Sequence, residues 1–434
     1  MPFDVTAYPC LSRIISEAYH GQIVYKHHID GAHDRNWLKE YELFYNKQLN
    51  STPYVRRVFF KYDEPKGKSI GFVDLRSATD GSEVSETYLS APKPLSESNG
   101  AYLKCEGRYT EYGQDVRCTP YIMPDSIFGM CIHGSLWIAI KILENRRTVA
   151  SAVTIPEIQT LARGHPYADK EGLYFKQAAR LLRMSQTHAI YVQRASPDLD
   201  DDGMLLELYS YVESGLPVIL GVDTQYLPWW AGASEHDYHS IVAIGHTMKD
   251  NVVDGFIFHD ESALPYQTLK NGDLLNAWRI AIQNAVPDQE VRELLVAVPP
   301  EVTLQFTDAF NQFREMLELV QQKGIFQVNA DGIRFRPVLL TAMELLFHYR
   351  DVNGRILRPF YECVTPATYL WVIFWYDEHD DRRSIATAKG FFVRDATRET
   401  NFRFIYFKQD KTGVYQSRDK IYQIWENRKS RKRL

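Results

Sequence analysis

Residues 131–143 read CIHGSLWIAIKIL, and this stretch decides how the centre of the chain folds. Its apolar side chains lie almost all round a helical projection, which predicts a helix buried inside a domain rather than one lying on its surface. The helix is expected to begin at Cys131. A thiol at a helix N-terminus meets the positive end of the helix dipole, which lowers the thiol pKa and favours the thiolate. Cys131 is therefore a candidate nucleophile.

A histidine and an acid stand at the ends of two later strand-like runs. His239 opens the run SIVAIG at residues 240–245, and Asp260 follows the run GFIFH at residues 255–259. The order Cys, His, Asp is that of a thiol nucleophile, its general base and the acid that orients the base. The sequence therefore predicts a catalytic triad of Cys131, His239 and Asp260.

The segment around these residues resembles the papain-like cysteine peptidases, and within them the bacteriocin-processing (double-glycine) type and its relatives. The resemblance covers about residues 120–300 and rests on the order of its pieces: the Cys and Ser-Leu offsets in 131–136, the helical segments 154–163 and 172–184, the strand GLPVI at 215–219, the His-led strand 239–245 and the strand 256–260 that ends in Asp. It implies a buried helix packed on an antiparallel sheet. It also implies hydrolysis of a peptide or isopeptide bond in a protein or peptide substrate, through a thioester at Cys131 and without a cofactor.

The sequence departs from that family on the oxyanion side. The family usually has a Gln five or six residues before the Cys, whereas residues 119–130 contain no Gln and carry Asp125 and Ser126 near that place. We expect Asp125 and Ser126 to lie on the oxyanion side, with backbone N–H groups supplying the hydrogen bonds. Two alternatives stay open: a catalytically degenerate binding module, and an acyltransferase or deamidase that uses the same triad.

Two adjacent tryptophans, Trp229 and Trp230, lie in a Pro/Gly-containing loop just before His239. Aromatic side chains in such a loop are suited to walling a cleft, so we expect both residues to contact the substrate. His133, His236 and His246 surround the triad in the sequence, but their spacing is not that of metal ligands. The sequence therefore predicts no metal site.

At 434 residues, the chain is long enough for several domains. We expect an α+β protein with an N-terminal β-rich domain at residues 1–118, the papain-like cysteine peptidase core at 119–300, a C-terminal α+β extension at 301–426 and a basic tail at 427–434. The N-terminal pattern predicts a helix at 34–49 and strands at 55–62, 69–75, 84–89 and 101–109. The C-terminal pattern predicts helices at 307–323 and 337–349 and strands at 369–376, 387–393 and 402–407.

Composition indicates which partners and which cellular compartment to expect. A net charge of −5 argues against nucleic-acid binding by the body of the protein. The five cysteines are widely spaced and odd in number, which argues against a disulfide framework and favours the reducing cytoplasm. We expect neither a signal peptide nor a membrane span. Only the basic tail suggests a weak anionic partner.

Overall fold

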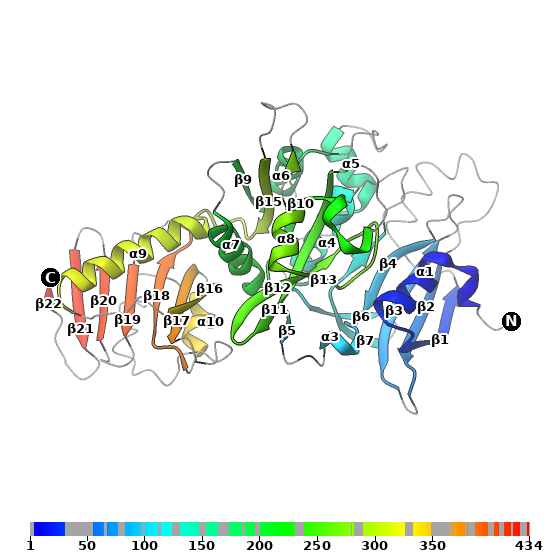
Figure 1. The fold of residues 1–434 in the computed structure, drawn as a ribbon, viewed down its shortest axis with the longest axis horizontal. Helices are drawn as coiled ribbons and strands as arrows, with labels where there is room; N and C mark the ends of the chain where they lie inside the picture. Colours follow the sequence, from blue (N-terminus) through cyan, green and yellow to red (C-terminus); the bar gives the residue numbers. More distant parts are fainter. Residues whose placement is uncertain are drawn as a thin grey trace. The chain divides into compact units, whose positions relative to one another are not determined.

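The computed structural model describes residues 4–30, 55–64, 67–76, 83–96, 98, 100–111, 114–123, 131–146, 153–163, 173–184, 187–195, 200–230, 238–278, 280–281, 290–325, 333–348, 365, 368–377, 380, 387–397, 403–407, 412–417, 420–425 and 432–433. The chain is a mixed α+β protein whose sheets are mostly antiparallel (Figure 1). It divides into two compact units. The first comprises Met1–Asp201, Gly215–Met248 and Val253–Pro299, and the second comprises Asp202–Ser214, Lys249–Val252 and Pro300–Leu434.

The first unit contains an antiparallel sheet built from N-terminal residues, in which the strands expected at 55–62, 69–75 and 84–89 are present. Its order is β1 (Ile23–Asp30), β2 (Val55–Tyr62), β3 (Ser69–Arg76), β4 (Val84–Leu89) and β8 (Tyr121–Ile122). The shorter elements of this region are η1 (Val5–Ala7), α1 (Pro9–Arg13), η2 (Ile14–Ala18), α3 (Lys93–Ser96) and the hairpin of β6 (Gly107–Glu111) and β7 (Gln114–Cys118). The helix expected at 34–49 lies outside the described residues.

A second, eight-stranded sheet forms the centre of the same unit. Its order is β13 (Gln267–Lys270), β12 (Val252–His259), β11 (Tyr238–Lys249), β10 (Val218–Asp223), β15 (Glu290–Val298) and β14 (Ile280–Ala281), with β5 (Ala101–Leu103) paired to β11 and β9 (His188–Ala195) paired to β15. Helix α4 (Cys131–Asn145) contacts β10 and the helices α5 (Ile155–Arg163) and α6 (Phe175–Met184). Most of its side chains are buried, as the apolar pattern of residues 131–143 predicted. The connections also contain η4 (Thr224–Tyr226), η5 (Pro228–Trp230) and α8 (Asn271–Ala277).

The boundary that we expected between residues 118 and 119 does not separate two compact units, because strands cross it in both directions. From the N-terminal side, β5 pairs with β11 of the central sheet, and Leu103 lies opposite Gly245. From the central side, β8 pairs with β4 of the N-terminal sheet, and Tyr121 lies opposite Thr87. A Cβ atom on Gly245 would stand 2.5 Å from the carbonyl oxygen of Tyr102, so only glycine permits this approach. The exchange ties the two sheets into one unit.

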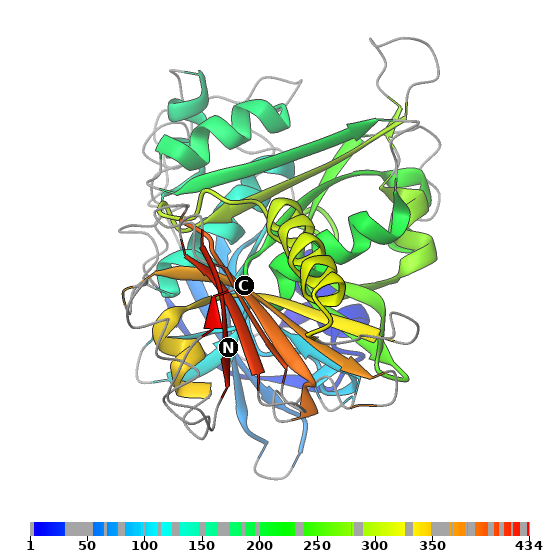
Figure 2. The same cartoon turned by 90° about the vertical axis from the view of Figure 1, so that its left-hand side faces the viewer.

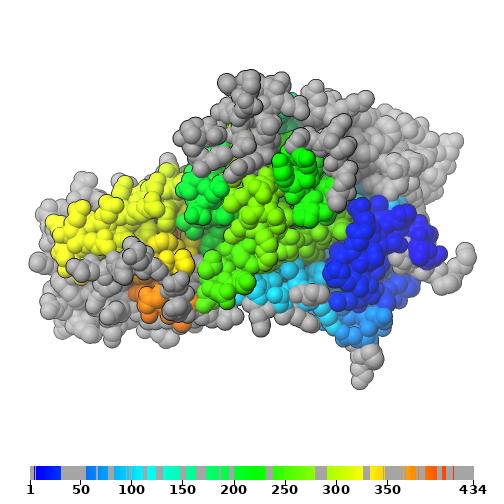
Figure 3. Space-filling model, in the orientation of Figure 1, coloured from blue at the N-terminus to red at the C-terminus, as the bar shows by residue number. Residues whose placement is uncertain are grey.

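The second unit holds an antiparallel sheet with helices on both faces (Figure 2). Its strands are β16 (Ile333–Thr341), β17 (Tyr369–Asp377), β18 (Gly390–Asp395), β19 (Arg403–Phe407), β20 (Thr412–Ser417), β21 (Lys420–Trp425) and β22 (Lys432–Arg433), in this order. Helix α9 (Phe306–Gln322) buries Phe313, Met316 and Val320 against one face of the sheet, while its outer side remains on the surface (yellow in Figure 3). Helix α10 (Ala342–His348) packs on the other face. The long segment of this unit begins at Pro300, next to the boundary that we expected at 300/301. Helix α7 (Asp201–Glu213), where Glu213 pairs with Arg336, also belongs mainly to this unit.

Two expectations for this unit need correction. The helix expected at 337–349 is wrong in its first part, because residues 337–341 form the end of β16, with Pro337 opposite Ile373. The helix begins only where Thr341 and Glu344 form a reciprocal capping box, with Glu344 Oε2 2.7 Å from the Thr341 backbone N–H. In the basic tail, residues 432–433 form the edge strand β22, and the rest lies outside the described residues.

Among the helices that the structure describes, none is both long and apolar enough to cross a bilayer.

Candidate functional site

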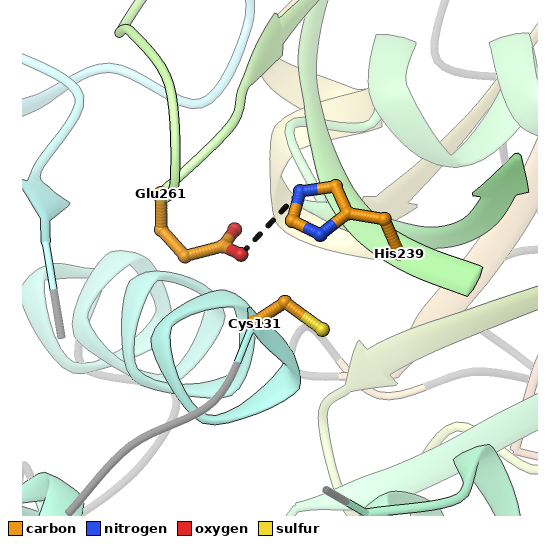
Figure 4. A group of neighbouring side chains, drawn as sticks. All are labelled: Cys131, His239 and Glu261. Atoms are coloured by element: carbon orange, nitrogen blue, oxygen red, sulfur yellow. Dashed lines mark ion pairs between the residues drawn. The ribbon is translucent and has the colours of Figure 1, made fainter. Parts of the chain in front are cut away.

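The first unit brings Cys131, His239 and Asp260 together from three elements. Figure 4 shows Cys131 and His239 together with Glu261, the residue that follows Asp260. Cys131 is the first residue of α4, His239 is the second residue of β11, and Asp260 directly follows β12. Because β11 and β12 are neighbours in the sheet, the histidine at the start of one and the acid after the end of the other lie at the same edge. The apolar face of α4 is buried in the unit, and this packing presents the helix N-terminus to that edge.

His239 bridges the thiol and the acid. Its Nε2 lies 2.8 Å from Oδ1 of Asp260. Its other ring nitrogen, Nδ1, is directed toward Cys131 in Figure 4, and the two side chains are hydrogen-bonded. The side chain of His239 is 6% exposed and that of Asp260 is fully buried, so water hardly competes for these bonds. The arrangement is that of a nucleophile, a base and an orienting acid.

The surroundings favour a thiolate–imidazolium pair. Burial alone would raise the pKa of Cys131, but the hydrogen bond and charge of His239 and the hydrogen bonds from Ser240 outweigh burial, so the pKa of Cys131 is lowered. Burial alone would lower the pKa of His239, but the neighbouring acids, Asp260 before Glu261, and the hydrogen bonds with Asp260 and Cys131 outweigh burial, so the pKa of His239 is raised well above its usual value. The thiol therefore loses its proton more easily than usual, and the imidazole holds one more firmly.

Both tryptophans contact the acid of this triad. Nε1 of Trp229 and Nε1 of Trp230 donate to Oδ2 of Asp260 at 2.7 and 2.8 Å. Burial alone would raise the pKa of Asp260, but the charge of His239 and these hydrogen bonds lower it. Trp230 also lies beside the imidazole ring of His239, with 5.2 Å between the ring centroids. We expected both tryptophans to contact substrate; the contacts that the structure gives them are with the triad itself.

Glu261 is a site residue that the sequence did not predict. It is fully buried, its Oε1 lies 3.6 Å from Nε2 of His239, and its Oε2 lies 3.2 Å from Oγ of Ser135. Burial is the main reason why the pKa of Glu261 is raised well above its usual value. Two adjacent acids after a buried strand were visible in the sequence, but nothing local indicated that the second one also turns inward.

Among the described residues, Cys131, His239 and Glu261 form the group that could hold a metal ion. Ligand atoms of Cys131, His239 and Glu261 all lie within 4.8 Å of one another. Every one of them already has partners in the protein, because Nε2 bonds Asp260, Oε2 contacts Ser135 and the sulfur bonds His239. We therefore interpret the group as a hydrogen-bonded cluster and assign no metal to it. His133 and His246 are not members of this group, and His236 lies outside the described residues.

Asp125 and Ser126, which we expected on the oxyanion side, also lie outside the described residues. The structure therefore places Cys131, His239 and Asp260 beside one another, and the oxyanion side stays a prediction. No known protein-family model and no curated protein matches the sequence.

The tryptophan contacts predict a measurable contribution to folding. Trp229→Phe or Trp230→Phe keeps the aromatic ring but removes one donor to the buried Asp260 carboxylate. Losing a hydrogen bond to a charged group costs about 1.5–3 kcal/mol, and the half-buried indoles place the expected loss near the lower end. Urea unfolding should therefore show a lower free energy of unfolding for each variant. Tyr174→Phe, at an exposed aromatic residue, is the control and should not differ from the parent. Unchanged stability in both tryptophan variants would show that these bonds do not hold Asp260.

Proposed function

We propose that this protein is a thiol-dependent hydrolase that cleaves a peptide or isopeptide bond through a thioester intermediate on Cys131. The observation that carries the proposal is the position of His239. Its Nε2 is bonded to Asp260, and its other ring nitrogen, Nδ1, faces the thiol of Cys131. The shifted pKa values of Cys131 and His239 support an ion pair ready for nucleophilic attack.

The reaction follows from these contacts. The Cys131 thiolate attacks the substrate carbonyl carbon, and the protonated Nδ1 of His239 gives its proton to the leaving amine, so that the amine departs and a thioester remains. Nδ1 then removes a proton from water, which attacks the thioester, releases the acid and restores the thiolate and the imidazolium. Asp260 accepts a hydrogen bond from Nε2 throughout and keeps the ring oriented. Oxyanion stabilisation is expected from backbone N–H groups at the start of α4.

The fold is consistent with a papain-like cysteine peptidase core. A buried helix that starts at the thiol packs on an antiparallel sheet whose strands carry the histidine and precede the acid, in the order that the family resemblance implies. The N-terminal sheet and the C-terminal unit would then be additions to this core. Cys10, Cys105, Cys118 and Cys131 are free thiols in the structure, which agrees with the reducing cytoplasm as the proposed location.

Two alternatives use the same residues. An acyltransferase or deamidase would form the same kind of covalent intermediate and differ in the substrate or the final acceptor. A catalytically degenerate binding module would keep the fold without a reactive thiolate. The second alternative is motivated by the missing Gln before Cys131, and thiol reactivity separates it from an enzyme.

The ion pair predicts that Cys131 reacts with iodoacetamide at pH 6. An ordinary thiol of pKa about 8.5 is only about 0.3% thiolate at that pH, so we expect Cys131 to react more than about tenfold faster than free cysteine. Burial raises the pKa of Cys10 to about 11, so that thiol should stay unmodified. Mass spectrometry of the labelled peptides identifies the site, with Cys131→Ala as the blank.

His239→Ala should slow this labelling to the rate of an ordinary buried thiol, since the cation that holds the thiolate is lost. His246→Ala is the matched control, because His246 is a buried histidine on the same strand β11 but is not bonded to the thiol. Labelling of Cys131 that rises only near pH 8.5 would favour the degenerate binding module.

Hydrolysis is tested with a mixture of proteome-derived peptides, by counting new amino termini and by measuring the mass of acylated protein. Cys131→Ala and His239→Ala should abolish both signals, and Asp260→Asn should lower them less than either, because Asp260 orients the base and does not react. Asp254→Asn, at an acid on β12 that pairs with Lys270, is the matched control and should cleave normally. Cleavage at the parent rate in Cys131→Ala would place the chemistry elsewhere.

A further inference from the structure

A line of buried hydrogen-bonding groups runs from Glu261 to the Cys131 sulfur. Glu261 Oε2 lies 3.2 Å from Ser135 Oγ, and Ser135 Oγ lies 3.0 Å from Ser240 Oγ. Ser240 in turn bonds the sulfur of Cys131, through its hydroxyl and through its backbone. The side chains of Glu261, Ser135 and Ser240 come from different segments of the first unit, and all three residues are fully buried.

The hydrogens in this line can be ordered in one way when its far end is a thiolate. A thiolate only accepts, and each serine has a single O–H to donate. Ser240 must then donate to Cys131, and Ser135 must donate to Ser240. Ser135 can receive a hydrogen from Glu261 only if that carboxyl is protonated. An ionised Glu261 would instead draw the Ser135 hydrogen to itself and leave the two serine oxygens facing each other, 3.0 Å apart, without a hydrogen between them.

We propose that Glu261 is a positioning residue that acts as a neutral carboxylic acid, donating its proton to Ser135 so that Ser135 donates to Ser240 and Ser240 donates to the Cys131 thiolate. No proton leaves its oxygen in this arrangement. Because every donor in the line points the same way, the bonds polarise one another and stabilise the negative charge on sulfur without adding a further charge to the buried site. The inference rests on the proposed function, because it requires a thiolate at Cys131. It adds Glu261, Ser135 and Ser240 to the residues that stabilise this thiolate.

The groups around Glu261 agree with a neutral acid. His239 and Asp260 face it from β11 and from the turn after β12, Cys131 faces it from α4, and the phenol of Tyr121 approaches from β8. The hydroxyl of Ser262 contacts Oε1 at 3.4 Å. Burial, followed by the charges of Asp260 and Cys131, raises the pKa of Glu261 against the opposite effect of His239. Asp260, which receives two indole hydrogen bonds, carries the negative charge of this pair of acids.

The test is a titration of the Cys131 thiolate by its ultraviolet absorbance, taken as the difference between each protein and the same protein with Cys131→Ala. Ser135→Ala removes one oxygen from the middle of the line, and Glu261→Leu removes its donor. Each should raise the midpoint of the titration by about one pH unit, a tenfold loss of thiolate. The double variant should not exceed either single change by much, because both interrupt the same line.

Glu261→Gln distinguishes a neutral acid from a charged partner of His239. A glutamine can still donate an N–H to Ser135, so its midpoint should stay within about 0.3 pH unit of the parent, whereas it would move like the leucine variant if Glu261 acted as an anion. Ser262→Ala is the matched control, because Ser262 contacts Glu261 outside the line. If the leucine variant does not fold, the alanine and glutamine variants decide between the two outcomes on their own.

The possible outcomes separate the proposed function, the line of hydrogen bonds and the neutral acid. A parent protein whose thiolate forms at an ordinary thiol pH contradicts the proposed function and the line together. A parent that titrates low while Ser135→Ala leaves the midpoint unchanged overturns the line alone. A midpoint that rises in Glu261→Gln as much as in Glu261→Leu overturns the neutral acid.

Discussion

The bond between His239 and Asp260 is the interaction on which the site depends. A buried imidazole would otherwise lose its proton, because burial disfavours its charged form. The Asp260 carboxylate, 2.8 Å away, reverses that preference and leaves Nδ1 to face Cys131. Asp260 in turn stays ionised in the interior because the charge and hydrogen bond of His239 lower its pKa, and because two indole N–H groups bind its second oxygen. The charge on sulfur is thus supported by a sequence of contacts that reaches back to Trp229 and Trp230.

Two adjacent acids take different parts because their surroundings differ. Asp260 receives donors on both oxygens, whereas Glu261 has a serine hydroxyl near each oxygen and an ionised neighbour. Neighbouring carboxyls in one buried site cannot both ionise cheaply, so the acid with better donors takes the charge. On this account Asp260 holds the base by charge, and Glu261 supports the thiolate through two serines.

The sequence predicted those features that depend on local pattern. The apolar run after Cys131 gives the buried helix α4, and the runs beside His239 and Asp260 give β11 and β12. Cys131, His239 and Asp260 were predicted to meet from their order along the chain. His239 and Asp260 do lie close together, because β11 and β12 are neighbours in the sheet. Other features depend on contacts between distant segments. The strand at Pro337 is an apolar run that suits a helix equally well until it is paired with β17, and the exchange of β5 and β8 has no local signal. The burial of Glu261 and the hydrogen bonds from Trp229 and Trp230 to Asp260 likewise depend on how the loops fold, so the sequence did not predict them.

The central claim is that His239 is a cation beside a thiolate, and its ring nitrogens report this directly. Nitrogen NMR of protein labelled with ¹⁵N-histidine, assigned by comparison with His239→Ala, measures whether both ring nitrogens carry protons. We expect both nitrogens of His239 to be protonated at pH 7 in the parent protein, and the pKa of His239 to fall in Cys131→Ala, where no thiolate remains to favour the cation. A neutral His239 at pH 7, unchanged by the loss of the thiol, would contradict the account.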